Sequence, residues 1–201
     1  MKGNLTPYLT SSDKRECLKH LIIKKAIKIK DVTLSSNQKS EVYYDIKELV
    51  NDPEGVTLIG ELMLEKLREI QPDVKSVGGL EIGAIPITTA IVYYSNQLGN
   101  ESKVSGFMVR KNPKTHGLQK LIEGNIIKPL VVVDDVITTG KSVLDAVEAL
   151  RNQGISTDNI LSVIDRQSNE NLLVQKHYKF DSLFKHSEFA EYIESQTTIK
   201  Q

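Results

Sequence analysis

The apolar run Leu130-Val131-Val132-Val133 limits the possible folds more than any other part of the sequence. β-branched residues favour strands, and a strand without polar side chains has to be covered on both faces. Strand-like and helix-like segments alternate around this run: strands are predicted at 74–77, 103–109, 129–133, 160–164 and 178–183, and helices at 86–98, 141–153, 172–175 and 188–193. This alternation predicts an α/β fold with a mostly parallel, twisted sheet flanked by helices.

The first 70 residues follow a different pattern. Apolar residues three and four positions apart predict an amphipathic helix over 13–30. Two β-prone pieces within 32–44, interrupted by polar residues, predict a hairpin-like excursion. A further helix is predicted over 55–70, and Gln71-Pro72 ends it. The N-terminal part of the chain is therefore expected to differ in architecture from the rest.

The chain of 201 residues contains no repeat and no linker that would divide it. Single domains commonly contain about 100–200 residues, so we expect one domain over 1–201. Within it, residues 1–45 are expected to form an appendage to an α/β core over 46–201.

Charge and cysteine content restrict the partners and the compartment. Lys plus Arg and Asp plus Glu both number 26, so the chain lacks the basic excess that is typical of nucleic-acid binders. Cys17 is the only cysteine, which precludes an intrachain disulfide and fits a reducing compartment. No apolar stretch approaches the roughly 20 residues that span a bilayer. We expect a cytoplasmic protein that binds neither nucleic acid nor membranes.

Two carboxylates and a turn rich in hydroxyl groups follow the apolar run directly: Asp134, Asp135, Val136, Ile137, Thr138, Thr139, Gly140, Lys141 and Ser142. A helix is predicted to begin here, and its free N–H groups and positive dipole end suit a phosphate. Paired carboxylates beside a phosphate site are useful if they accept hydrogen bonds from sugar hydroxyls or hold a hydrated cation. The alternative is that the aspartates only cap the helix. The segment favours a sugar phosphate as ligand.

This stretch resembles the signature of the type I phosphoribosyltransferases. The resemblance implies that Asp134 and Asp135 contact the ribose, and that the loop from Val136 to Ser142 wraps the 5′-phosphate. The Walker A pattern is absent, because Asp135 stands where its first glycine would be.

A second segment, 110–124, contains several potential cations: Arg110, Lys111, Lys114, His116 and Lys120. A cationic loop can stabilise a pyrophosphate as it departs with its charge, although a solvated surface loop can have the same composition.

This loop resembles the catalytic loop of the orotate phosphoribosyltransferases at Arg110-Lys111, Lys114 and His116-Gly117. The resemblance implies that Lys114, His116, Lys111 and Arg110 are catalytic. It also implies a homodimer in which the 110–124 loop reaches the neighbouring active site.

Three further segments resemble the same family. Asp165-Arg166-Gln167 matches the element whose arginine pairs with orotate, and such a guanidinium–carboxylate pair suits an acidic pyrimidine. The segment 77–86 matches the pyrophosphate loop, with Ile82 where some members have lysine. The segment 34–45 matches the N-terminal hood strand, with Ser35 where some members have lysine. The candidate orotate contacts are Arg166, Thr138, Tyr43 and Tyr44.

The resemblance implies the type I phosphoribosyltransferase fold with a small N-terminal hood. It implies transfer of a phosphoribosyl group from phosphoribosyl pyrophosphate to orotate in pyrimidine biosynthesis. Mg²⁺ is the implied cofactor, bound through pyrophosphate and ribose with a water link to Asp134 or Asp135 rather than by direct protein ligands. Two alternatives remain open: a type I enzyme for another base, and a regulatory relative that senses phosphoribosyl pyrophosphate without catalysis.

Overall fold

The computed structural model describes residues 10–33, 39–99, 103–112 and 121–198. Its main feature is a six-stranded sheet with the order β5-β4-β3-β6-β7-β8, in which every neighbouring pair is parallel except the antiparallel pair β4–β5. The strands are β3 (Ser76–Leu80), β4 (Ser105–Val109), β5 (Ile122–Gly124), β6 (Leu130–Ile137), β7 (Asn159–Asp165) and β8 (Lys179–Lys185). This sheet confirms the predicted α/β class with mostly parallel strands.

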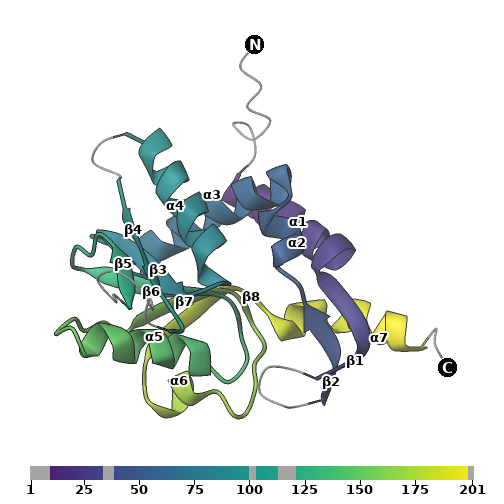
Figure 1. Ribbon diagram of the computed structural model, residues 1–201. Helices are drawn as coiled ribbons and strands as arrows, with labels where there is room; N and C mark the ends of the chain where they lie inside the picture. The colour runs from purple at the N-terminus through teal and green to yellow at the C-terminus, as the bar shows by residue number, and fades with distance from the viewer. Residues whose placement is uncertain (1–9, 34–38, 100–102, 113–120, 199–201) are drawn as a thin grey trace.

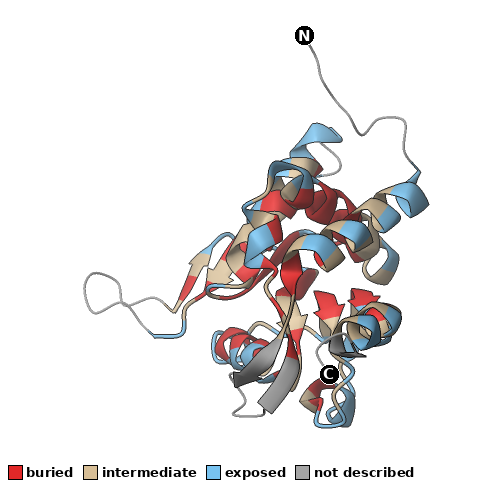
Figure 2. Cartoon of the chain, turned by 90° about the vertical axis from the view of Figure 1, so that its right-hand side faces the viewer, coloured by how far each residue is buried: buried red, intermediate tan, exposed pale blue. Residues whose placement is uncertain are grey.

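Helices cover both faces of the sheet (Figure 1). On one face lie α3 (Pro53–Ile70) and α4 (Ala84–Gln97), with α1 (Ser11–Leu21) packed on α3. On the other face lie α5 (Lys141–Arg151) and α6 (Leu172–Gln175). Figure 2 shows buried residues in the strands and on the inward sides of the helices, with the exposed residues on the outward sides.

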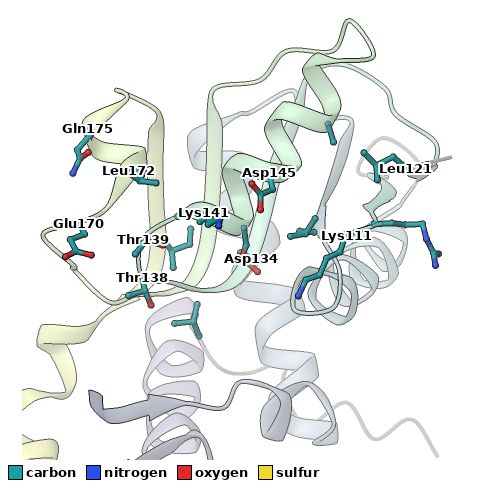
Figure 3. Close-up of a pocket in the computed structure, with 17 residues that line it drawn as sticks. Lys111, Leu121, Asp134, Thr138, Thr139, Lys141, Asp145, Glu170, Leu172 and Gln175 are labelled. Carbon is teal, nitrogen blue, oxygen red and sulfur yellow. The ribbon is translucent and has the colours of Figure 1, made fainter. Parts of the chain in front are cut away.

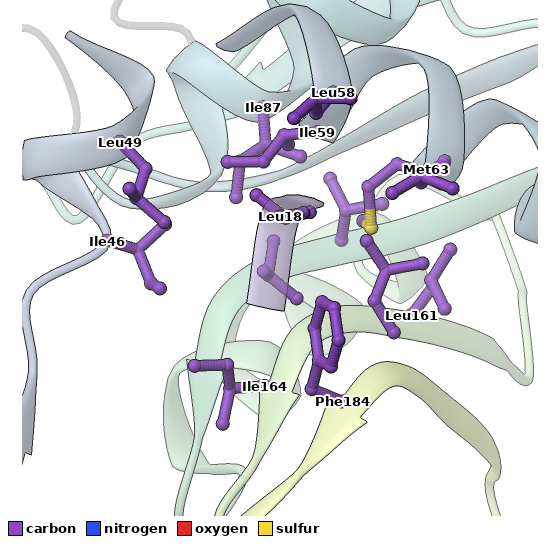
Figure 4. Close-up of a cluster of buried hydrophobic side chains, with 14 of the residues drawn as sticks. Leu18, Ile46, Leu49, Leu58, Ile59, Met63, Ile87, Leu161, Ile164 and Phe184 are labelled. Carbon is purple, nitrogen blue, oxygen red and sulfur yellow. The ribbon is translucent and has the colours of Figure 1, made fainter. Parts of the chain in front are cut away.

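The apolar run in β6 divides its side chains between two hydrophobic clusters. Val131 and Val133 belong to the cluster beneath α3 and α4, whereas Leu130 and Val132 belong to the cluster beneath α5. This division follows from the alternation of side chains along a strand. The first cluster also joins distant parts of the chain, from Leu18 in α1 to Phe184 in β8 (Figure 4).

The N-terminal segment differs from its prediction in part. α1 continues through a π-helical turn at Ile22–Ala26, after which the chain forms β1 (Ile27–Thr33). The predicted helix over 13–30 is therefore wrong beyond residue 26. β1 pairs antiparallel with β2 (Lys39–Tyr44), so the predicted hairpin is present, but its first strand begins at Ile27 and not within 32–44. Cross-strand pairing outweighs the helical spacing of the isoleucines here, because tertiary contacts override local propensity.

The glycines of β3 were predicted to lie in a loop, and this prediction is wrong. Gly78 and Gly79 are buried in β3 and pair with β4. A side chain at either position would collide with a neighbouring backbone, at Phe107 and at Val133 respectively. The absence of a Cβ atom lets the three central strands approach one another closely.

Two other strand limits differ from the prediction. β6 continues through both aspartates to Ile137, where the sequence predicted that it would end before Asp134. β5 pairs with β4 inside a segment that was predicted to be entirely loop. α2 (Lys47–Val50), the 3₁₀-helix η3 (His186–Phe189) and α7 (Ala190–Thr198) complete the described elements. Across the described ranges, no helix has both the length and the apolar character needed to cross a membrane.

Candidate active site

A pocket of about 930 Å³ lies at the carboxyl ends of the central strands, where ligands bind in open α/β sheets. Its lining combines the end of β6, the turn that follows, the start of α5 and the residues after β4: Leu80, Arg110, Lys111, Leu121, Asp134, Val136, Ile137, Thr138, Thr139, Gly140, Lys141, Ser142, Asp145, Ala149, Glu170, Leu172 and Gln175. The structure thus brings eight residues of the predicted 134–142 segment together with Arg110 and Lys111.

Asp134 is the buried carboxylate of the pocket, with a relative exposure of 8%. Burial, followed by the nearby charge of Asp135, raises the pKa of Asp134 well above its usual value, and Lys111 opposes this shift. In Figure 3, Lys111 and Asp134 face the same hollow, while Thr138 and Thr139 lie on the far side of Asp134 from Lys111. A group that donates a hydrogen bond here would stabilise the charged form of Asp134.

Asp135 is absent from the pocket lining, and its carboxylate approaches the turn before α4. A Cβ atom at Gly83 would lie 2.7 Å from Asp135 Oδ1, so the carboxylate in this position packs directly against the glycine. The amide N–H of Val136 donates to Asp135 Oδ1 at 2.8 Å, and the amide N–H of Asp135 donates to Asp134 Oδ1 at 3.0 Å. The two carboxylates are therefore held by the local backbone.

The N-terminus of α5 is capped by Gly140 without a side-chain hydrogen bond. This observation removes the alternative in which Asp134 or Asp135 merely caps the helix. Gly140 has a φ of +78°, and a Cβ atom there would lie 2.6 Å from Leu173. Glycine adopts this left-handed conformation without the strain that a side chain would add. The first amide groups of α5 remain available to an anion in the pocket.

The cationic side of the pocket is fixed at the base of the 110–124 loop. The amide N–H of Arg110 donates to the carbonyl of Leu121 at 2.8 Å, and that of Lys111 donates to Glu81 Oε1 at 3.0 Å. Arg110 Nη1 also lies 3.1 Å from Glu123 Oε1, so an acidic partner compensates its charge. Lys114 and His116 lie outside the described residues.

Arg166 follows β7 at the same edge of the sheet, and its amide N–H donates to the carbonyl of Ile137 at 2.9 Å. Its guanidinium carbon lies 5.7 Å from the ring centroid of Tyr44. Tyr44 is only 3% exposed, and its hydroxyl oxygen lies 2.7 Å from His186 Nδ1. These residues do not line the large pocket, but the structure joins two of the predicted orotate contacts, Arg166 and Tyr44.

Tyr43 is separated from that group. Successive side chains of a strand point to opposite faces, so Tyr43 and Tyr44 face away from each other across β2. The Tyr43 hydroxyl instead accepts a hydrogen bond from Lys47 Nζ at 3.4 Å.

Three residues of this region have contacts that the sequence did not predict: Glu81, Gly83 and His186. Their roles depend on partners 30 to 142 positions away, as in the bonds from Glu81 to Lys111 and from His186 to Tyr44. No local sequence pattern predicts contacts between residues so far apart in the chain. Glu81 and Gly83 lie within the segment 77–86, which was predicted to bind pyrophosphate as a whole.

The fold and the pocket are those of an α/β enzyme with a site suited to an anion at the carboxyl edge of a parallel sheet. No protein-family model matches the chain. The chain is 40% identical over 181 residues to the orotate phosphoribosyltransferase of Aquifex aeolicus. The matched region covers 87% of this chain and 96% of the relative. It therefore belongs to the orotate phosphoribosyltransferase family.

Solved structures agree with this assignment. The orotate phosphoribosyltransferase of Mycobacterium tuberculosis H37Rv, in complex with Fe(III) dicitrate, has a TM-score of 0.72 and 32% identity, covering 87% of this chain and 97% of the other. The same enzyme in complex with 5-phospho-α-D-ribosyl 1-diphosphate has a TM-score of 0.69 and 29% identity, covering 88% and 99% of the two chains.

Proposed function

We propose that the protein transfers the phosphoribosyl group of 5-phosphoribosyl 1-pyrophosphate to orotate, giving orotidine 5′-monophosphate and pyrophosphate in UMP biosynthesis. One juxtaposition supports this proposal most strongly. The buried carboxylate of Asp134 lies in the same pocket as the start of α5, where no side chain caps the helix, and Lys111 lines that pocket as well. A ligand with hydroxyl donors, a phosphate and a second anionic group complements this arrangement.

In the proposed complex, the 5′-phosphate lies at the turn and first residues of α5. The amide groups there donate to its oxygens, and the hydroxyls of Thr138, Thr139 and Ser142 add donors. The ribose hydroxyls are proposed to donate to Asp134, which lines the pocket, and to Asp135, whose carboxylate lies beside the pocket against Gly83. These hydrogen bonds favour the ionised form of Asp134 and so offset the effect of its burial.

Mg²⁺ is the cofactor of the proposed reaction, and the acidic residues fit it. Within the described ranges, no group of three or more His, Cys, Asp or Glu side chains could hold a metal ion. Mg²⁺ commonly takes one or two carboxylates and completes its shell with water and substrate phosphates. Asp134 and Asp135 would meet this need through water, and the ion would neutralise charge on the pyrophosphate.

The reaction breaks the bond between the anomeric carbon and a pyrophosphate oxygen, and forms a bond from that carbon to the ring nitrogen of orotate. The pyrophosphate keeps the electron pair, and the nitrogen loses its proton. Lys111, Lys114 and Arg110 would stabilise the charge on the departing group. We propose His116 for any proton transfer. Closure of the loop would exclude water from the electrophilic ribose.

The orotate carboxylate is proposed to pair with Arg166, whose guanidinium has the bidentate geometry that a carboxylate requires. Thr138 would add a hydroxyl contact. Since Tyr43 and Tyr44 occupy opposite faces of β2, we propose Tyr44 as the tyrosine nearer to the base, because it lies beside Arg166.

We also propose that the protein is a cytoplasmic homodimer in which the 110–124 loop completes the active site of the neighbouring subunit. The amide N–H of Arg110 donates to the carbonyl of Leu121, and this bond joins the two ends of the stretch between β4 and β5. The loop therefore leaves from and returns to one point beside the pocket.

Pyrophosphate release tests the proposed substrate. The protein is supplied with phosphoribosyl pyrophosphate and Mg²⁺, together with orotate, uracil, adenine or hypoxanthine. We expect release with orotate at least about 100-fold faster than with the other bases, because only orotate presents a carboxylate to Arg166. Preferred turnover of a purine would contradict the proposal. Binding of phosphoribosyl pyrophosphate without turnover of any base would instead support the regulatory alternative.

A further inference from the structure

The 3₁₀-helix η3 near the C-terminus contacts the N-terminal hairpin through Tyr44. The Tyr44 hydroxyl oxygen lies 2.7 Å from His186 Nδ1, and the two rings meet edge to face with centroids 5.9 Å apart. The ring of Phe189, from the same 3₁₀-helix, lies 5.8 Å from the Tyr44 ring. Two side chains of η3 therefore contact the Tyr44 ring.

The same 3₁₀-helix also holds the turn that carries Arg166. The amide N–H of Ser187 donates to Gln167 Oε1 at 2.8 Å, and the amide N–H of Gln167 donates to Asp165 Oδ1 at 2.8 Å. On the other side of this turn, the Arg166 amide is bonded to Ile137 in β6. The backbone around Arg166 is thus tied both to the sheet and to η3.

η3 thus contacts both Tyr44 and the turn that carries Arg166, and these two residues also contact each other. The guanidinium carbon lies 5.7 Å from the Tyr44 centroid, a distance at which the ring face attracts a cation. Burial, with a smaller effect from the charge of Arg166, lowers the pKa of His186. A neutral imidazole can accept the hydroxyl hydrogen of Tyr44 at Nδ1, which fixes the direction of the phenol ring.

We propose that His186 is a positioning residue for the base: it acts through Tyr44 to hold the Arg166 guanidinium in the plane that receives the orotate carboxylate. This inference rests on the proposed pairing of Arg166 with orotate. A bidentate pair depends on the orientation of both planes, so a small rotation of the guanidinium weakens it. The C-terminal segment would then contribute to selection of the base without touching it.

Steady-state kinetics of Tyr44→Phe and His186→Phe test this role. Each variant removes the hydrogen bond and retains an aromatic ring. We expect the KM for orotate to rise roughly fivefold, the effect of one ordinary hydrogen bond, while kcat and the KM for phosphoribosyl pyrophosphate stay within about twofold. The double variant should show no further increase, because both changes remove the same interaction.

Two further variants separate positioning from general stability. His186→Asn places an amide near the position of Nδ1, and we expect it to restore most of the affinity for orotate. His20→Phe is the matched control, because His20 is an exposed histidine of α1 that bonds only its own helix, at Glu16. Equal changes in both KM values and kcat, with no rescue by asparagine, would overturn the positioning role.

Arg166→Lys distinguishes failure of this inference from failure of the proposed function. If Arg166→Lys raises the KM for orotate but Tyr44→Phe and His186→Phe do not, the positioning role is wrong and the proposed orotate site stands. If Arg166→Lys leaves the KM for orotate unchanged, the proposed pairing is wrong and the inference fails with it. Since Tyr44→Phe only deletes an oxygen, it remains informative even if a His186 variant folds poorly.

Discussion

Asp134 is the residue at which stability and ligand binding oppose each other. Its carboxylate is buried next to Asp135, and burial raises its pKa well above the usual value of 3.8. A group held in this way costs folding free energy whenever it must ionise. Functional sites commonly retain such destabilising groups, because hydrogen bonds from the ligand offset the unfavourable free energy of the buried charge.

We therefore expect Asp134→Asn to stabilise the unliganded protein by about 1 kcal/mol at neutral pH and to weaken binding of phosphoribosyl pyrophosphate about tenfold or more. Because the folded-state pKa lies above the unfolded one, the cost is absent below the unfolded pKa and grows as pH rises toward the folded value. The stabilisation should accordingly vanish near pH 4, about the unfolded pKa. Denaturant unfolding at several pH values and titration calorimetry measure the two effects. A destabilised variant with unchanged affinity would contradict this account.

At the scale of elements, the connection from β6 to α5 determines the geometry of the proposed phosphate site. Gly140 has a positive φ, and Leu173 of α6 occupies the space that a side chain would need. The amide groups of α5 can face the pocket only if this turn is preserved.

Gly140→Ala is expected to destabilise the protein by about 1–3 kcal/mol, the usual cost of a left-handed residue with a side chain. It should also weaken binding of phosphoribosyl pyrophosphate, because the start of α5 must shift away from Leu173. Gly154→Ala provides the control: Gly154 also has a positive φ, but a Cβ atom there would meet nothing within 4 Å. Thermal unfolding together with ligand binding separates the two, since only Gly140→Ala should affect binding. Equal effects on binding in both variants would contradict the assignment.

Some of the strands and turns could be predicted from the sequence, and others could not. The apolar run of β6 has no polar face, so its burial between two helical layers was predictable, as was the hydroxyl-rich turn after it. Gly78 and Gly79 were misassigned because glycine usually marks a loop, whereas here it permits close strand packing. The strand at Ile27 was missed because its spacing also fits a helix. The contact of Tyr44 with Arg166 spans 122 positions, and no local pattern encodes it.

At the scale of the whole molecule, the proposed sharing of the 110–124 loop means that a subunit with a defective loop and a subunit with a defective pocket can together form one intact active site. A mixture of Lys114→Ala and Asp134→Asn subunits would contain hybrid dimers, each with one site made from an intact pocket and an intact loop. If subunits mix at random, half of the dimers are hybrids and half of their sites are intact, so about a quarter of normal activity should return.

Activity of the mixture, measured after subunit exchange, tests this prediction. Each variant alone serves as the baseline. A mixture no more active than the average of the two variants would contradict loop sharing, although it would leave the residues of each site unaffected.

We propose that this pocket transfers a phosphoribosyl group to orotate with help from the cationic loop. The most direct measurement is the loss of orotate absorbance on adding phosphoribosyl pyrophosphate and Mg²⁺, for the unaltered protein, for Lys114→Ala and for Lys24→Ala. Lys24 is an exposed lysine of the N-terminal π-helical turn and is the control. We expect a Mg²⁺-dependent loss of orotate whose rate falls by about 10²–10³ in Lys114→Ala and is unchanged in Lys24→Ala. Absence of orotate loss in the unaltered protein, or full activity in Lys114→Ala, would contradict it.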